Sequence, residues 1–403
     1  MFHALISALL LSAGYNTALV TVGAALLGAS AGAIGAFVLL RKRSLVSDAV
    51  SHATLPGLAL AFIVMAMLGG DGRWLPGLLI GAALSSALGL YLVEWITRRT
   101  RLTEDAAIGA VLSVFFGAGV VLLTVIQTLE SGRQAGISGF LLGSTAGMLR
   151  SEAETIAIAA LLTGLAVYML RRPFTLVCFD ADYAAARGID IRLTDFAMLG
   201  LLLAVTVIGL KVAGLVLIVA LTIIPPVAAR FWTERPGRMV LIAAGLGALA
   251  AYFGAALSST AARLPTGALI VLSAFALFLV SLTLSPVRGL LAKAIARYRF
   301  QRQVHERQGL LAIARGEPVY DTYTLRVLRS KGLIRRDGVP TDAGRGAAVS
   351  VARDEALWSL YRRHHPEEAA AMEHQGLVPI DDALPPDVIA ELDGHFAPQE
   401  VST

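Results

Sequence analysis

The sequence predicts an all-α polytopic membrane bundle of about nine transmembrane helices, followed by a cytoplasmic α-rich, winged-helix-like domain. Hydrophobic residues make up 56% of the 403-residue chain, and charged residues only 16%, against about 25% in soluble domains. The mean hydropathy is +0.70. Charge is uneven, because residues 291–403 hold 31 of the 63 Asp, Glu, Lys and Arg side chains. The chain therefore divides into a membrane domain, residues 1–290, and a soluble domain, residues 291–403.

Apolar stretches of roughly 20 residues, the length needed to cross about 30 Å of hydrocarbon, recur along the first domain. Between residues 195 and 231 only Gly209, Lys211 and Gly214 offer a turn, so a single long, broken helix is the alternative there. Residues 134–149 are apolar but short, and we interpret them as re-entrant or interfacial. The predicted spans are 17–40, 44–68, 75–97, 104–128, 152–170, 195–212, 213–231, 237–258 and 264–286.

Basic residues set the expected orientation of the bundle. They follow the first, third and fifth spans, whereas the alternate loops have almost no excess positive charge. The positive-inside rule then places the N-terminus outside and the tail in the cytoplasm, which nine spans satisfy. The net positive charge of the chain comes from these loops, so no nucleic-acid partner is expected. The runs are Arg41, Lys42 and Arg43; Arg98, Arg99 and Arg101; and Arg171 and Arg172.

Glycines recur at intervals of four residues within several spans. Such pairs allow transmembrane helices to approach each other closely. We expect tight helix packing at these positions, not a role in lining a pore. The pairs are Gly28/Gly32, Gly77/Gly81 and Gly139/Gly143.

Asp48 and His52 are the ionisable residues of the second span that could carry chemistry. Their spacing of four places both on one helix face, with about 5–6 Å between Cβ atoms. An intramembrane carboxylate costs at least ~2.5–3.5 kcal/mol on insertion scales, so it usually faces a cavity or a partner. A carboxylate oxygen with an imidazole nitrogen suits zinc, manganese or iron(II). The alternatives are a buried hydrogen bond that fixes packing, or a pair at the cytoplasmic interface.

Residues 44–62, SLVSDAVSHATLPGLALAF, closely resemble the signature of the zinc/manganese/iron permease family of ABC transporters, the ABC-3 type. The resemblance covers about residues 15–285 and continues, in the order of the family, through further motifs. The further motifs are EDAAIG (104–109), LLGS (141–144), FDADYAAARGI (179–189), VAGLVLIVALTIIPPVAAR (212–230) and LPTGALIVL (264–272). The resemblance implies that Asp48 and His52 belong to the metal pathway.

The resemblance also implies a role for the loop 173–193. In the family this loop forms a short coupling helix that docks on the ATPase, which points to Asp182, Arg187 and Gly188. Its alanine-rich core, ending at Gly188, fits a short helix with a glycine cap. The alternative is a solvated connector whose charges do nothing specific.

The resemblance implies the permease subunit of an ATP-driven importer of divalent metal in a bacterial plasma (inner) membrane. The chain has no Walker A motif, so it is not expected to be an enzyme, and a separate cytoplasmic ATPase would hydrolyse ATP. Further expected partners are an extracytoplasmic metal-binding protein and a second permease subunit. The metal is the transported substrate, and no permanently bound cofactor is expected.

The tail resembles the iron- and manganese-dependent repressor family. Residues 304–347 match its winged-helix part, although too little chain lies between Gly316 and Thr324 for the first helix of a helix-turn-helix. Glu355, Glu373 and His374 could form a partial metal site; a degenerate packing or regulatory module is the alternative. By analogy the tail favours manganese or iron over zinc as the transported ion.

Two other functions remain open at this stage. An ABC permease for metal chelates such as haem, siderophores or cobalamin would need a wide pathway and no isolated Asp–His pair. A membrane-tethered metal-sensing regulator would use the bundle only as an anchor, for which nine spans are far too many.

Overall fold

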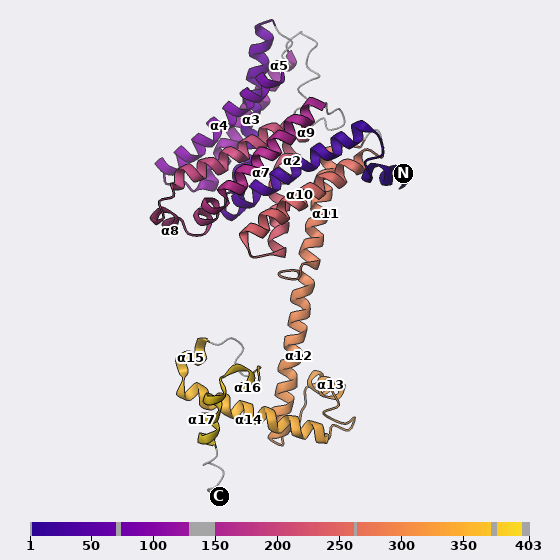
Figure 1. Ribbon diagram of the computed structural model, residues 1–403, viewed down its shortest axis with the longest axis vertical. Helices are drawn as coiled ribbons and strands as arrows, with labels where there is room; N and C mark the ends of the chain where they lie inside the picture. Colours follow the sequence, from indigo (N-terminus) through magenta and orange to yellow (C-terminus); the bar gives the residue numbers. More distant parts are fainter. Residues whose placement is uncertain (1, 70–73, 129–149, 262–263, 372–376, 397–403) are drawn as a thin grey trace. The chain divides into compact units, whose positions relative to one another are not determined.

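The computed structural model describes residues 2–69, 74–128, 150–261, 264–371 and 377–396. Its fold separates into two compact units, Met1–Leu291 and Ala292–Thr403, which Figure 1 shows together with their helices. Within the described ranges every regular element is a helix, apart from one antiparallel bridge between Ile334 and Pro340. The prediction of an all-α bundle is confirmed for these residues.

The membrane unit contains eight described helices that are long and apolar enough to span a bilayer, where the sequence predicted nine. The difference lies between residues 195 and 231, where one element replaces two predicted spans. Residues 134–149 lie outside the described residues. The described helices of the unit also include two short ones, α1 (Phe2–Leu9) and α8 (Ala181–Ala186). The long helices are α2 (Tyr15–Leu40), α3 (Ser44–Met67), α4 (Leu75–Arg99), α5 (Glu104–Thr128), α7 (Arg150–Phe179), α9 (Ile191–Trp232), α10 (Pro236–Ser258) and α11 (Thr266–Leu284).

Helix α9 is the broken helix that the sequence left as an alternative. Its break is at Gly214, whose φ of 71° is non-helical and suits a residue without a Cβ. The chain folds back there, because the Cα of Gly209 lies close to the side chain of Ile218. The returning leg contains the apolar helix Leu217–Trp232, which is shorter than the other candidate spans. The predicted seventh span is therefore present only as this short leg.

Helix α7 is longer than the predicted span 152–170. It continues through Arg171, Arg172 and Pro173 to Phe179, so the predicted loop 173–193 shrinks to the segment around α8. Arginines end an apolar run in sequence, but their long side chains allow a helix to continue while the guanidinium groups stay exposed.

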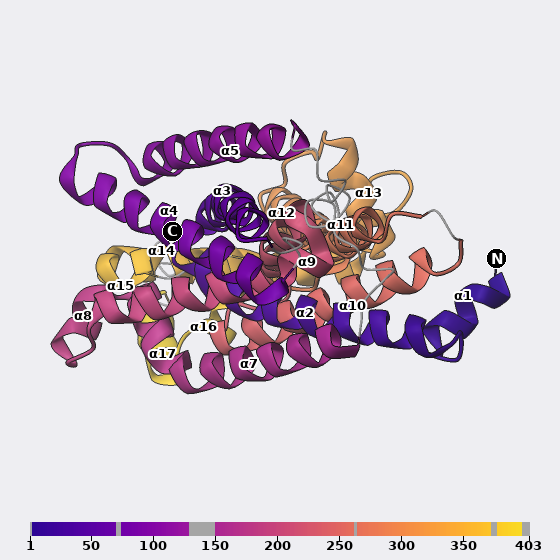
Figure 2. The same cartoon turned by 90° about the horizontal axis from the view of Figure 1, so that it is seen from above.

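Glycines bring α2 and α10 into backbone contact. A Cβ added at Gly28 would lie 2.2 Å from the carbonyl oxygen of Gly247, and one at Gly32 would lie 2.3 Å from that of Ala243. Figure 2 shows the two helices running side by side through the unit. The expected packing role of Gly28 and Gly32 is thus confirmed, and α2 becomes the central helix of the bundle.

Helix α3 is held in the same way by its neighbours α4 and α5. A Cβ at Gly57 would meet the carbonyl oxygen of Gly81 at 2.1 Å, whereas Gly89 approaches Ala53 and Gly119 approaches Leu55. These close approaches fix the middle of α3, the helix that carries Asp48 and His52.

The second unit folds around two small apolar clusters. One contains Leu310, Leu328, Ile334 and Ala348, and the other is centred on Trp358. The segment between Ala314 and Thr322 contains no helix, as the short sequence there predicted. The helices are α12 (Leu290–Ala314), α13 (Thr322–Ser330), α14 (Asp342–His364), α15 (Pro366–Ala371), α16 (Ile380–Ala383) and α17 (Pro386–Phe396).

Replacing Gly28 with alanine should destabilise the membrane unit by roughly 1–3 kcal/mol, the usual cost of overpacking, because the methyl group would overlap the Gly247 carbonyl. The apparent melting temperature of the detergent-solubilised protein would measure the loss. Gly245→Ala on α10 is the control, since its methyl group would meet no atom within 4 Å. Equal melting temperatures for the two variants would contradict the close contact.

Candidate metal site and coupling helix

Asp48 and His52 lie on one face of α3, as their spacing predicted. The Nε2 atom of His52 is 3.4 Å from Oδ1 of Asp48. At 1.5 Å per residue from Ser44, the two residues lie about 6 and 12 Å along the helix. The pair therefore belongs to the first half of α3, near the end of the bundle where the α2–α3 turn lies.

The pair is partly exposed, and one of its ligand atoms is free. The side chains of Asp48 and His52 keep 37% and 24% of their exposure. The His52 ring stands edge-on to Phe116 of α5, with 5.0 Å between the ring centroids. Its Nδ1 atom is buried and has no hydrogen-bond partner among the described residues. A buried imidazole nitrogen without a partner is costly unless something binds it.

Neighbouring hydroxyl groups do not complete the pair. Ser47 and Ser51 donate to the carbonyl oxygens of Ser44 and Ser47, both at 2.8 Å, and so are satisfied within the helix. Pro56 has no N–H to donate to the carbonyl oxygen of His52, four residues earlier, which leaves that oxygen as a candidate metal ligand. No group of three or more His, Cys, Asp or Glu side chains that could hold a metal occurs in the described part of the chain.

An ion-pair cluster surrounds the α2–α3 turn, directly before the Asp48–His52 pair. We call it the turn cluster; it consists of Arg41, Arg43, Glu94, Glu104 and Asp195. From the sequence these arginines were expected only to set the orientation, and their carboxylate partners were not predicted. The available signal was the presence of acidic residues at the ends of three other spans.

Arg41 makes the tightest contacts of the turn cluster. Its Nε and Nη2 atoms lie 3.0 and 3.1 Å from the two oxygens of Asp195, and its Nη1 donates to the carbonyl oxygen of Val177 at 2.9 Å. A bidentate arginine–carboxylate pair of this kind is among the strong hydrogen-bonded ion pairs. It joins the end of α2 to the start of α9 and the end of α7.

Arg43 links the same point to two further helices. Its Nε lies 3.0 Å from Glu104 at the start of α5, and its Nη1 lies 3.8 Å from Glu94 near the end of α4. The Oδ2 atom of Asp195 is 3.9 Å from the same Nη1. The turn cluster thus connects the helix ends that frame the first turn of α3.

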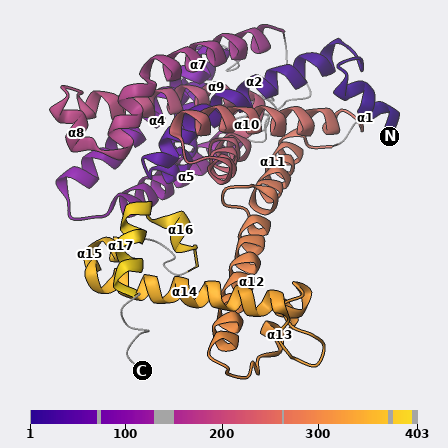
Figure 3. The ribbon, with the colours of Figure 1, turned by 60° about the horizontal axis from the view of Figure 1, so that its bottom comes forward.

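Helix α8 is the short helix predicted before Gly188. Asp180 caps it by accepting from the N–H of Tyr183 at 2.9 Å, and Gly188 ends the turn with a φ of +78°. Asp182 and Arg187 are exposed, and the Arg187 guanidinium lies 5.8 Å from the centre of the Tyr183 ring. Figure 3 shows α8 at one end of the unit, between α7 and α9.

Helix α8 is connected to α3 through the first turns of α9. Asp190 caps α9 by accepting from the N–H groups of Arg192 and Leu193. Asp195, about one turn further along, is the partner of Arg41 in the turn cluster. A displacement of α8 would therefore reach the α2–α3 turn through a short, capped helix start.

The tail site predicted from Glu355, Glu373 and His374 stays a prediction. Glu355 accepts from Arg307 at 2.8 Å and from Arg362 at 3.1 Å. The hydrogen bond from Arg307 lowers the pKa of the Glu355 carboxyl. Glu373 and His374 lie outside the described residues.

Replacing Asp195 with asparagine should destabilise the membrane unit, because Arg41 would keep its charge and lose its anion. We expect roughly 1–3 kcal/mol, below the 3–5 kcal/mol seen for fully buried pairs, since the two side chains retain 22% and 12% exposure. Thermal unfolding in detergent would measure it. The exposed pair Arg288–Glu234 supplies the control, because Glu234→Gln should change stability by less than about 1 kcal/mol. A larger loss in the control would refute the dominance of the turn cluster.

Comparison with known proteins places these features in a family. A model described as the ABC 3 transport family matches residues 15–285. The manganese transport system membrane protein MntC of Bacillus subtilis (strain 168) is 42% identical over 299 residues, which is 74% of this chain and 67% of that protein. The zinc transport system membrane protein TroC of Treponema pallidum (strain Nichols) is 36% identical over 285 residues, 71% of this chain and 94% of that protein.

A solved structure has the same fold. It is titled PsaBC from Streptococcus pneumoniae in complex with Fab, and it aligns with a TM-score of 0.61 at 27% identity. The alignment covers 72% of this chain and 98% of the matched chain. Because the family model spans more than half of the sequence, the chain belongs to the ABC 3 transport family.

Proposed function

We propose that this chain is the membrane-spanning permease subunit of an ABC importer, and that it carries a divalent transition metal past Asp48 and His52. The observation that carries the proposal is the pair itself. It is partly exposed within a membrane-spanning helix, and the buried Nδ1 of His52 has no partner among the described residues. Ionisable groups in such a position usually mark an ion pathway.

Manganese is the favoured ion, with iron and zinc as alternatives. One carboxylate and one imidazole suit manganese, iron(II) and zinc alike. The relative named for manganese is more similar than the one named for zinc, at 42% against 36% identity. The repressor-like tail predicted from the sequence also favours manganese or iron.

A second copy of the permease would double the number of protein ligands to the ion. One chain offers a carboxylate and an imidazole, whereas zinc takes four ligands and manganese about six. Two copies meeting on a two-fold axis would supply two of each. Four such donors can replace water around the ion and still release it.

The energy would come from a separate cytoplasmic ATPase that docks on α8. Asp182 and Arg187 offer exposed charges there, and Asp190 and Asp195 connect α8 to the turn cluster. An extracytoplasmic metal-binding protein would deliver the ion to the opposite mouth. In this arrangement the N-terminus is outside a bacterial plasma membrane, and the tail is cytoplasmic and regulatory.

The other candidate functions have less support. A chelate permease needs no isolated Asp–His pair, and its bulky substrate would require a wide pathway. A membrane-tethered regulator would not need eight candidate spans joined by buried glycine contacts and ion pairs.

Replacing Asp48 with asparagine, or His52 with glutamine, should lower ATP-dependent metal uptake by at least about tenfold, the smallest loss expected even for an outer-shell partner of a metal ligand. Asparagine removes the anionic oxygen, and glutamine removes the imidazole nitrogen. Uptake of manganese, iron and zinc into proteoliposomes holding this chain and its ATPase would measure the effect.

Ser51→Ala is the matched control for this experiment. It removes a buried hydroxyl group from the same helix, and that hydroxyl group already donates to a carbonyl oxygen within the helix. It should leave uptake within about twofold of the native rate. Native uptake and selectivity in both Asp48→Asn and His52→Gln would remove the pair from the pathway. The assignment as a permease would survive that result.

Replacing Gly188 with valine should uncouple ATP hydrolysis from uptake or weaken ATPase binding. A Cβ at Gly188 would meet no atom within 4 Å, so the cost comes from the left-handed backbone alone, about 1–2 kcal/mol or more for a β-branched residue. Gly188→Asn is the control, since asparagine tolerates this conformation. The uptake per ATP hydrolysed, or the assembly of the complex with the ATPase, should fall only in the valine variant; equal behaviour of the two variants would argue against a coupling role.

A further inference from the structure

A deep apolar groove lies on the membrane unit, away from Asp48 and His52. Helices α2, α7 and α10 line it, and its volume is about 1090 Å³, slightly above the range of about 300–1,000 Å³ for ligand pockets. The groove exists because α7 and α10 both pack against α2 but make almost no contact with each other. Small residues keep its walls low, among them Ala33 on α2, Gly164 on α7 and Ala244 on α10.

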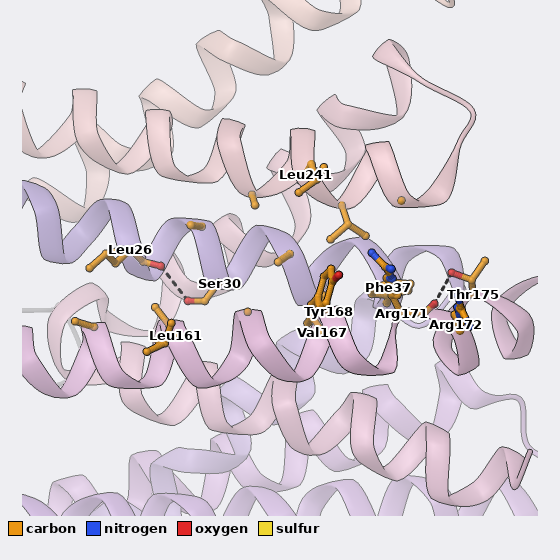
Figure 4. Close-up of a pocket in the computed structure, with 18 of the residues that line it drawn as sticks. Leu26, Ser30, Phe37, Leu161, Val167, Tyr168, Arg171, Arg172, Thr175 and Leu241 are labelled. Carbon is orange, nitrogen blue, oxygen red and sulfur yellow. Dashed lines mark hydrogen bonds between the residues drawn. The ribbon is translucent and has the colours of Figure 1, made fainter.

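Two arginines stand at one end of the groove. Arg171 and Arg172 are exposed, and neither forms an ion pair with a carboxylate in the described part of the chain. The Arg171 guanidinium lies over the ring of Tyr168, 4.2 Å from its centre. Figure 4 shows both arginines at the same end, with Leu26 and Leu161 at the other. The groove is therefore apolar along its length and cationic at one mouth.

The length of the groove matches one leaflet of a bilayer. Along α2 the lining runs from Leu26 to Phe37, which are 11 positions and therefore about 17 Å apart along the helix. Half of a hydrocarbon core is about 15 Å thick. The cationic end is the one that the positive-inside rule assigns to the cytoplasm, where anionic lipids are concentrated.

We propose that the groove binds a phospholipid of the cytoplasmic leaflet with an anionic headgroup, whose phosphate contacts Arg171 and Arg172 while an acyl chain lies along α2. An acyl chain would fill apolar volume that no side chain of α7 or α10 occupies. The guanidinium groups, with Thr175 one turn beyond, would hold the phosphate oxygens. A transmembrane helix, about 10–12 Å wide, is a poorer occupant, because an apolar helix would leave the two cations without an anion.

The test compares two lipids with the same acyl chains on the full-length chain in detergent. Phosphatidylglycerol and phosphatidylcholine are titrated, and bound lipid is counted by native mass spectrometry. Phosphatidylglycerol should bind the native protein more tightly and raise its melting temperature more, because the choline cation of phosphatidylcholine offsets the charge of its phosphate. In Arg171→Gln/Arg172→Gln its affinity should fall about 30-fold, to that of phosphatidylcholine.

Two matched variants separate the groove from general effects. Arg99→Gln/Arg101→Gln removes the same charge from a different loop and should leave lipid binding unchanged. Gly164→Leu fills the groove without a clash, since a Cβ there meets no atom within 4 Å, and should abolish binding of both lipids. Gly245→Leu, equally unobstructed but outside the groove, should retain both.

Three outcomes would overturn the proposal. The first is equal affinity of the native protein for the two lipids. The second is full phosphatidylglycerol binding by Arg171→Gln/Arg172→Gln or by Gly164→Leu. The third is a change of oligomeric state in Gly164→Leu with unchanged lipid binding, which would assign the groove to a second copy of the chain. None of these outcomes depends on metal transport, so the proposed function would be unaffected.

Discussion

The arrangement of the membrane unit depends on the two arginines of the α2–α3 turn. A guanidinium stays charged at any physiological pH, and Arg41 and Arg43 are mostly buried. Each therefore needs a carboxylate, and the carboxylates come from α9, α4 and α5. Satisfying two cations thus brings together the ends of helices that are far apart in sequence. The first turn of α3 takes its position from this contact, and so do Asp48 and His52 further along the helix.

Helix α2 links this end of the unit to its interior through contacts of opposite kinds. Glycines let the α10 backbone approach until carbonyl oxygens nearly touch the Cα atoms of Gly28 and Gly32. On its other side, α2 meets α7 through larger side chains, such as Phe37 against Phe174 with ring centroids 5.2 Å apart. Other small residues line the groove, such as Ala33 on α2 and Ala244 on α10, and they leave the space between α10 and α7 unfilled. A tight helix pair and an open groove therefore lie side by side on α2.

Local features of this chain could be predicted from its sequence, and long-range ones could not. The spacing of Asp48 and His52 was enough to place both on one helix face. The family resemblance implied a short helix after Phe179, and the alanine-rich composition there fitted a helix ending near Gly188. The pairing of Arg41 with Asp195 joins residues 154 positions apart, and no local pattern encodes it. The extension of α7 past Arg171 was missed because a charge in an apolar run signals a helix end and a snorkelling side chain equally. The break at Gly214 was left open for a similar reason, since glycine permits a reversal without requiring one.

The position of the Asp48–His52 pair within α3 bears on how a stroke at α8 would act on a bound ion. The pair lies between the turn cluster and Pro56, where the helical hydrogen-bond ladder is interrupted. Pro56 divides α3 into a first part, which continues directly from the α2–α3 turn, and a second part, which packs on α4 through Gly57 and Gly81. A shift of α9 that moves Asp195 would be transmitted to the two donors before it reached the rest of the helix. In the proposed dimer each chain would supply these two side-chain donors, so a small displacement of one copy would be enough to break the coordination and release the ion.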